Sequence, residues 1–173
     1  MKYRFPKHGE LTVYGYNRDL TEYVTEKQLL DENLWKLFVN QYRIHSDKNG
    51  DWRGEYWGKT MRGGCLIYES YKSERLYNVL AATVKEMISV QEKSGRLSTY
   101  PMEIEFNGWD MWCRKYVMLG MLYFLPICKS KDLERRIIVS LKKQADHIID
   151  HIGAEEGKKS ILDTCKLYGA MNS

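Results

Sequence analysis

Apolar residues recur at mixed three- and four-residue steps along most of the chain, the spacing of helices that bury one face. Polar or glycine-containing segments separate these stretches and mark the turns. The pattern predicts an all-α protein with about five helices. We expect them from Asp19 or Thr21 to about Asn40, from Glu55 to Tyr71, from Ser73 to Gly95, from Trp109 to about Leu125, and from Asp132 to Gly153.

The second predicted helix contains three glycines, Gly58, Gly63 and Gly64. A glycine in a helix interior costs about 1 kcal/mol relative to alanine, so we expect close packing to offset it. Ser73 is a suitable N-cap for the third helix, and Gly95 is expected to end it. The residues from Gly95 to Gly108 are predicted to form a loop.

The last four helices form two similar hairpins. Corresponding residues recur 57 positions apart in three pairs, Gly63 and Gly120, Leu76 and Leu133, and Val84 and Leu141, and the glycines Gly95 and Gly153 lie 58 apart. One such hairpin cannot bury its apolar face alone, so a genuine repeat implies that the units stack side by side. A chance alignment of two helical hairpins is the alternative reading.

Within each unit, a helix with tryptophan and glycine precedes a long helix with one apolar and one charged face. The first type suits an inner helix surrounded by neighbours, and the second an outer helix that faces water. Inner aromatic and outer amphipathic helices together predict an incomplete α/α toroid, with its ligand cavity at one end of the inner helices. We interpret residues 1–173 as one partial domain of this kind.

Composition narrows the function classes. The 27 basic and 23 acidic residues are interspersed and leave a net charge of +4, so no basic stripe favours nucleic acid. No uncharged apolar run reaches the length of a membrane span, and the first residues lack the apolar region of a signal peptide. We therefore expect no membrane or nucleic-acid partner and, by default, a cytoplasmic location.

The cysteines and histidines give no metal-binding pattern. Cys65, Cys113, Cys128 and Cys165 are widely spaced, so we expect free thiols, mostly buried, and no zinc site. His147 and His151 lie four residues apart on the last helix and could bind a metal, but a solvated helix end is the favoured interpretation.

Two clusters that combine indoles with charged groups lie where a loop enters an inner helix. The first runs from Asp51 to Lys59, the second from Asn107 to Lys115, and the turn-rich segment 91–100 is expected beside the second. Indole faces with flanking carboxylates and cations suit a sugar, whose C–H face packs on a ring while polar groups bind its hydroxyls. The candidate sugar contacts are Glu55, Trp57, Trp109, Asp110 and Arg114.

Structural roles compete with this interpretation. Trp57 and Trp109 could equally be core residues, and a core role is favoured for Trp112 and Tyr116. Glu55 and Lys59 could be a simple surface ion pair, because they are four residues apart on one helix. Glu55 and Asp110 are also a possible acid and nucleophile pair, although we expect them to bind hydroxyls, so the catalytic residues stay unassigned.

The ordered motifs resemble a known family. They are the segment 52–59, Gln91 with 95–100, 108–116 followed by Leu119 and Gly120, and the closing Asp163, Thr164 and 169–173. In this order they resemble the β-L-arabinofuranosidase-like glycoside hydrolases, family 127 and its relatives, from about Leu20 onward. The segment Gly95-Arg96-Leu97 departs from the family, which commonly has Gly-Tyr and an aliphatic residue there.

The resemblance implies a catalytic six-hairpin α/α toroid, of which this chain is a part, followed by β-sandwich domains, in a polypeptide several times longer than this one. It implies that the cysteine nucleophile and the zinc-binding glutamate and cysteines lie further along, so no cofactor is expected within this chain. The chain is then an N-terminal portion that supplies one wall of the sugar cavity, needs the missing C-terminal part, and is inactive alone. The alternatives are a non-catalytic helical module that binds glycan or protein, and another α/α-toroid enzyme such as a polysaccharide lyase or an epimerase.

Overall fold

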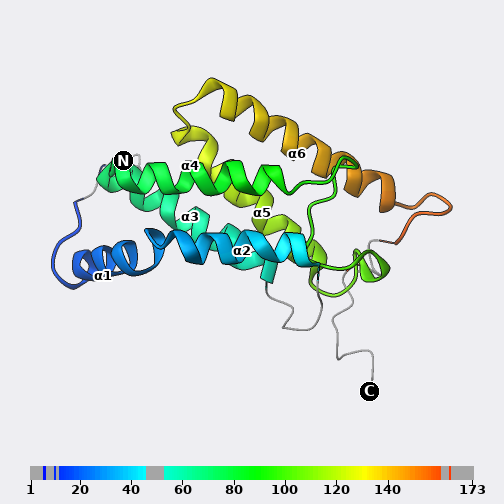
Figure 1. Ribbon diagram of the computed structural model, residues 1–173, viewed down its shortest axis with the longest axis horizontal. Coiled ribbons are helices and arrows are strands. Elements are labelled where there is room, and N and C mark those ends of the chain that lie inside the picture. The colour runs from blue at the N-terminus through cyan, green and yellow to red at the C-terminus, as the bar shows by residue number, and fades with distance from the viewer. Residues whose placement is uncertain (1–5, 7–9, 11, 46–52, 161–163, 165–173) are drawn as a thin grey trace, which may run out of the picture.

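The computed structural model describes residues 6, 10, 12–45, 53–160 and 164, and this part of the chain is helical without a β-strand. The elements follow in the order α1 (Tyr16–Val24), a π-helical turn (Thr25–Leu29), α2 (Glu32–Ile44), α3 (Arg53–Tyr71), α4 (Glu74–Ser89), a 3-10 turn (Met102–Ile104), α5 (Asp110–Phe124), a second 3-10 turn (Leu125–Ile127) and α6 (Lys131–His151) (Figure 1). The predicted all-α class is confirmed.

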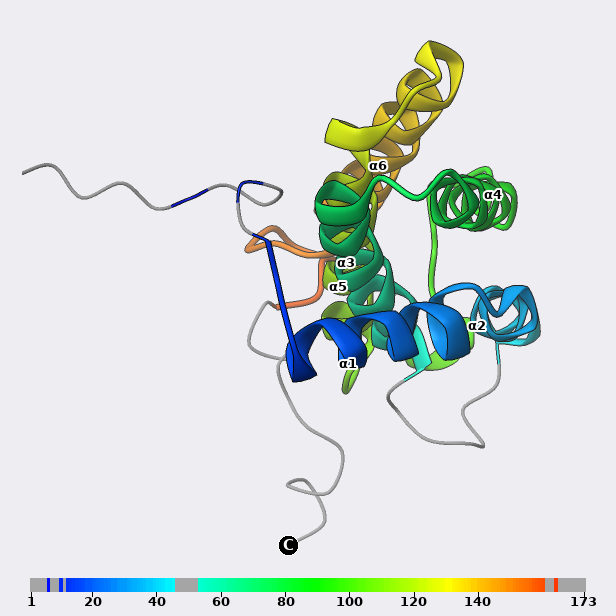
Figure 2. The same cartoon turned by 90° about the vertical axis from the view of Figure 1, so that its left-hand side faces the viewer.

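Helices α3 and α5 lie side by side and run in the same direction, with the other long helices around them (Figure 2). A Cβ on Gly54 would approach Cys113, and one on Gly58 would lie 2.0 Å from the Tyr116 carbonyl oxygen. A later residue of α3 thus contacts a later residue of α5, as expected for parallel helices. Gly120 in turn faces Trp57 and Gly58. Glycines thus bring the two helix backbones into direct contact.

Helices α2, α4 and α6 run opposite to α3 and α5. Trp57 in the first half of α3 bonds to Thr83 in the second half of α4, and the Met121 sulfur near the end of α5 lies 4.0 Å from the Ser140 hydroxyl of α6. Trp35 of α2 makes an edge contact with Trp57. From α2 onward the helices therefore alternate in direction, with α2 and α4 beside α3 and with α6 beside α5.

The single helix predicted from Asp19 or Thr21 to Asn40 is wrong. The structure divides this region into α1, the π-helical turn and α2, with a break after Leu30. The Asp31 carboxylate accepts hydrogen bonds from the backbone N–H groups of Asn33 at 2.9 Å and Leu34 at 3.2 Å. This cap satisfies two N–H donors that have no partner within a helix, so a new helix begins at Glu32.

Serine caps start both α4 and α6, as predicted for Ser73. The Ser73 hydroxyl accepts from the Leu76 N–H, and Ser130, 57 residues later, accepts from the Leu133 N–H. Helix α4 ends at Ser89, however, well before Gly95. Gly95 has φ +92° and lies so close to α6 that a Cβ would be 2.2 Å from the Lys143 carbonyl oxygen. Its role is this close approach, which no other residue could make without strain.

Close packing accounts for two of the three glycines inside α3. Gly58 touches α5, and a Cβ on Gly64 would lie 2.8 Å from a Leu80 methyl group. Gly63 faces open space instead, so the packing expected there is wrong. The core between the helices contains Trp35, Trp57, Met61, Leu76, Leu80, Val84, Met87, Val117, Met121, Phe124, Leu133 and Ile137. Among the described helices, none is long and apolar enough to cross a bilayer.

Candidate functional site

A cluster of rings lies over the first halves of α3 and α5. Trp109 precedes the first turn of α5, Trp112 is 38% exposed, and Tyr116 follows one turn later. The Trp109 and Trp112 rings meet edge to face at 5.9 Å, and the Trp112 and Tyr116 rings do so at 5.2 Å. Helical spacing places the last two on one side of α5, where part of each ring reaches the surface.

Glu55 links this cluster to α3. Its side chain is only 5% exposed, one carboxylate oxygen accepts from the Trp112 indole N–H, and the other accepts from the Lys59 ammonium at 2.8 Å. The Lys59 ammonium also lies 4.8 Å from the centre of the Tyr116 ring. The ion pair expected between Glu55 and Lys59 is present, but its carboxylate is buried instead of lying at the surface, and it also fixes the orientation of an indole on the neighbouring helix.

A second lysine covers the same rings. The Lys115 ammonium lies 3.4 Å from the centre of the Trp112 ring and 4.3 Å from that of Tyr116. Such cation–π contacts are worth about 0.5–1 kcal/mol at exposed sites. We call the group made of Trp109, Trp112, Tyr116, Glu55, Lys59 and Lys115 the ring face.

Trp57 does not belong to the ring face. Its side chain is fully buried, its indole N–H donates to the Thr83 hydroxyl at 2.9 Å, and its ring meets Trp35 edge to face at 6.4 Å. The sequence left Trp57 open between a sugar contact and a core residue, and the structure places it in the core. Trp57 and Trp109 do lie toward the same ends of two parallel helices.

Asp110 and Arg114 are also buried, and they hold the loop that precedes α5. The Asp110 carboxylate accepts from the Ser98 hydroxyl at 2.6 Å, from the Phe106 N–H at 2.8 Å and from the Arg114 guanidinium at 3.0 Å. With all these partners inside the chain, Asp110 is a structural anchor in this structure. The pairing of Glu55 and Asp110 as catalytic acid and nucleophile finds no geometric support, because partners occupy both carboxylates.

Glu105 is the centre of this network and was missed by the sequence analysis. One carboxylate oxygen contacts the guanidinium groups of Arg114 and Arg96, the latter at 3.1 Å, and lies 3.0 Å from the His147 ring nitrogen. Burial acts to raise the pKa of Glu105, but the hydrogen bond to His147 and the charges of Arg114 and Arg96 outweigh it and lower the pKa. No spacing rule connects a loop glutamate with a histidine 42 residues later, so only the fold reveals this cluster.

The histidines of α6 are placed differently from expectation. His147 is 6% exposed and packs against the Phe106 ring at 5.7 Å, so the solvated helix end expected for it is wrong. Its ring nitrogen faces Glu105, and the ring of His151 lies beside it in a tilted arrangement, with the ring centres 4.3 Å apart. Among the residues that the structure describes, no group of three or more histidine, cysteine, aspartate or glutamate side chains could hold a metal ion.

The described cysteines are free thiols. Cys65 and Cys113 are buried and Cys128 is partly exposed, while Cys165 lies outside the described residues. Burial raises the pKa of Cys65 and of Cys113 to about 12. Both thiols are therefore protonated at neutral pH and poor nucleophiles. Asp51 and Trp52 of the first sequence cluster, and the closing segments Asp163 and 169–173, also lie outside the described part.

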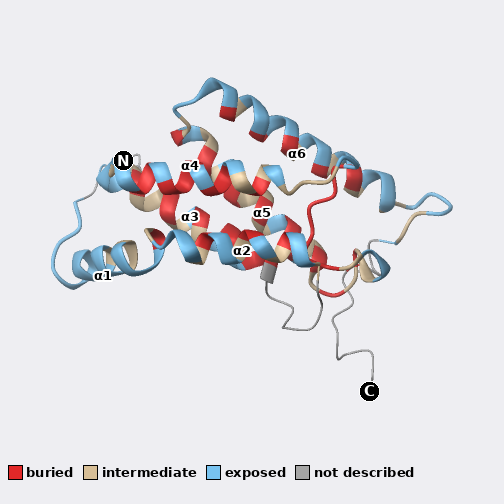
Figure 3. Cartoon of the chain, viewed as in Figure 1, coloured by how far each residue is buried: buried red, intermediate tan, exposed pale blue. Residues whose placement is uncertain are grey.

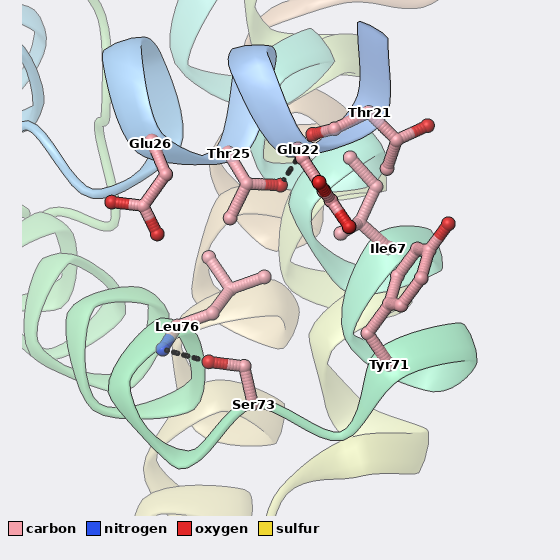
Figure 4. A pocket seen from close by; sticks show the side chains of 8 residues that line it. All are labelled: Thr21, Glu22, Thr25, Glu26, Ile67, Tyr71, Ser73 and Leu76. Atoms are coloured by element: carbon pink, nitrogen blue, oxygen red, sulfur yellow. Dashed lines mark hydrogen bonds between the residues drawn. The ribbon is translucent and has the colours of Figure 1, made fainter. Parts of the chain in front are cut away.

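Two hollows lie away from the ring face. One of about 290 Å³ lies between the π-helical turn, the end of α3 and the start of α4, with Ile67 and Leu76 at its apolar side and Glu22 and Glu26 at its rim (Figure 4). The other, of about 310 Å³, lies between α4 and α6. The first is at the opposite end of α3 from Glu55, so it cannot share a ligand with the ring face.

Comparison of the chain with protein-family models, with curated proteins and with solved structures returned no match. The function is therefore inferred from the ring face and from the arrangement of the helices that carry it.

Proposed function

We propose that this chain supplies one wall of the sugar-binding cavity of an α/α-toroid glycoside hydrolase that acts on arabinofuranose-containing or related plant glycans. The observation that carries the proposal is the ring face, where the partly exposed Trp112 is fixed by Glu55 beside Tyr116 and two lysines. An indole held in one orientation offers a flat apolar surface to the C–H groups of a sugar, and the charged groups around it can bind hydroxyls.

The helix arrangement supports the same proposal. In a toroid of helical hairpins, inner helices run parallel and outer helices run back between them. Here α3 and α5 are parallel and in backbone contact, and α4 and α6 return beside them (Figures 1 and 2). Both inner helices carry the ring face on their first halves, so the cavity of the completed toroid would open at that end.

In this proposal the chain binds sugar and does not complete the reaction. Glu55 and Asp110 are occupied by internal partners, and the buried thiols of Cys65 and Cys113 are protonated at neutral pH. We expect the nucleophile, the acid and any zinc ligands in the remaining part of the same polypeptide, and we expect no turnover of arabinofuranosides by residues 1–173 alone.

Calorimetric titration of the purified chain with arabino-oligosaccharides tests the proposal. We expect measurable binding that Trp112→Ala weakens about tenfold, because burying the apolar face of one ring against the ligand contributes on the order of 1.5 kcal/mol. Tyr23→Ala is the matched control, since Tyr23 is an exposed aromatic residue on α1, away from the ring face. Equal affinities for the wild type and Trp112→Ala would contradict the proposal.

A non-catalytic docking module is a second candidate, favoured by α1. This helix buries none of its residues and exposes Tyr16, Leu20 and Tyr23 as a stripe with helical spacing. If Leu20→Glu changes the oligomeric state in light scattering while no saccharide binds to the wild type, the docking module replaces the glycosidase proposal.

A further inference from the structure

The ring face has an excess of positive charge. The Glu55 carboxylate and the Lys59 ammonium neutralise each other at 2.8 Å. Lys115 is exposed and forms no ion pair with a carboxylate among the described residues; its contacts are with the Trp112 and Tyr116 rings. Within the part of the chain that the structure describes, Lys115 therefore leaves one cation without a carboxylate partner on the surface where a sugar would stack.

The position of this cation affects neutral and acidic ligands differently. The Lys115 ammonium lies over the ring of Trp112, which is the surface that a sugar must cover. A neutral sugar has to displace the ammonium and gives up its cation–π contact. A sugar with a carboxylate can keep the ammonium nearby as its counter-ion, and a hydrogen bond between two charged groups is stronger than one between neutral groups.

We propose that the ring face selects carboxylated sugars, such as uronates, over their neutral counterparts, with Lys115 as the specificity-determining residue. This inference rests on the proposed function, because it concerns the same ring face. It adds that the preferred glycan contains an acidic sugar, whether or not arabinofuranose is also present. The charge of Glu55 does not oppose this, since Lys59 and the Trp112 indole N–H both bind that carboxylate.

The test compares trigalacturonate with its fully methyl-esterified form, which has the same rings and no charge. We expect the wild-type chain to bind the acid about threefold to fivefold more tightly in calorimetric titration, because an ion pair with an exposed cation contributes up to about 1 kcal/mol. In Lys115→Gln the ratio between the two ligands should fall toward one, and Lys115→Arg should restore it. Raising the salt concentration should reduce the preference, because the cation is exposed.

Lys142→Gln provides the matched control, because Lys142 is an exposed lysine of α6 and its loss changes the net charge equally. This variant should keep the full preference for the acid. Equal binding of trigalacturonate and its ester by the wild type, or a preference that survives in Lys115→Gln, would overturn the inference and leave the proposed function standing. Binding of the acid that Trp112→Ala does not weaken would overturn both.

Discussion

The two hairpins, α3 with α4 and α5 with α6, have equivalent serine caps at the start of their second helix, but they are packed in different ways near the start of their first helix. Trp57 in the first and Arg114 in the second stand 57 residues apart, and both are almost fully buried. Trp57 packs against Trp35 and bonds to one hydroxyl of α4. Arg114 instead joins an ionic network with Asp110, Glu105 and, through Glu105, His147.

The reason for the difference is the loop between the hairpins. Beside Trp57 the neighbouring backbone is helical, so its polar groups are already bonded within the helix. Beside Arg114 the loop is buried from Gly95 to Tyr100, and its backbone has no helix to satisfy it (Figure 3). Arg96 donates to the Tyr100 carbonyl and Asp110 accepts from the Phe106 N–H. Charged side chains are therefore buried where buried loop backbone needs partners.

The largest effect is expected from removing Trp57, the buried indole of the first hairpin. Trp57→Ala should lower the free energy of unfolding by about 3–5 kcal/mol, because it leaves a cavity in a well-packed core. Chemical denaturation followed by circular dichroism measures this loss. Trp112→Ala is the control, since its partly exposed ring should cost much less. Similar losses for the two tryptophans would contradict the assignment of Trp57 to the core and Trp112 to the surface.

Breaking the ionic network around Arg114 in the second hairpin should destabilise the protein nearly as much. Glu105→Gln removes the carboxylate shared by Arg96, Arg114 and His147, and breaking a buried ion pair by removing one partner costs about 3–5 kcal/mol. We expect about 3 kcal/mol here, because the glutamine can still accept a hydrogen bond. Glu134→Gln, in an exposed pair with Lys131, should change stability by less than about 1 kcal/mol.

Comparing Glu105→Gln with the wild type also tests in which direction the stability of the fold changes with pH. The pKa of Glu105 in the folded protein lies below its ordinary value of 4.5, so the network stabilises the fold at pH values above 4.5. This contribution is lost as the pH falls below 4.5 and through the lowered folded pKa. The melting temperature of the wild type should therefore fall toward that of Glu105→Gln in acid. A constant difference between the two from pH 7 to pH 3 would contradict this role.

Local signals predicted the helices well and their ends less well. The periodicity and the serine cap placed the starts of α3, α4, α5 and α6 within a few residues. The break at Asp31 was missed because the apolar spacing continues through it, although Asp31 itself is a good cap. Gly95 was misassigned as a helix stop because its actual partner, the Lys143 carbonyl, is far away in the sequence.

The candidate site was predictable only in part. The sequence placed charged and aromatic residues together at the starts of two helices, and Glu55, Trp109 and Trp112 do meet there. The sequence favoured a core role for Trp112, which is wrong because that ring is 38% exposed, and it left the buried Trp57 open between core and sugar contact. Both tryptophans lie on helices with mixed faces, so helical spacing alone does not separate them. The direction in which each ring points depends on the parallel contact between α3 and α5, which is a long-range feature of the fold.

Identical substitutions at two glycines of α3 test that contact directly. Gly58→Ala should destabilise the protein by about 1–3 kcal/mol, because the added methyl group would meet the backbone of α5. Gly63→Ala should stabilise it by about 0.5–1 kcal/mol, because the position is helical and open. Thermal unfolding of both variants measures the two signs. If both changes have the same sign, α3 and α5 do not pack as described.

The smallest effect is expected from the serine caps, which both hairpins have. Ser73→Ala and Ser130→Ala should each lower the free energy of unfolding by about 1 kcal/mol, since each serine caps its helix through the same N–H three residues later. Ser70→Ala is the control, because its hydroxyl bonds to a carbonyl within α3 and caps nothing. Equal losses for the two caps, measured by chemical denaturation, would show that the hairpins are alike at the start of their second helices and differ in the packing around Trp57 and Arg114. A loss at Ser73 without one at Ser130 would mean that the start of α6 is held by something other than its cap, and the likeness between the hairpins would then not extend to how their helices begin.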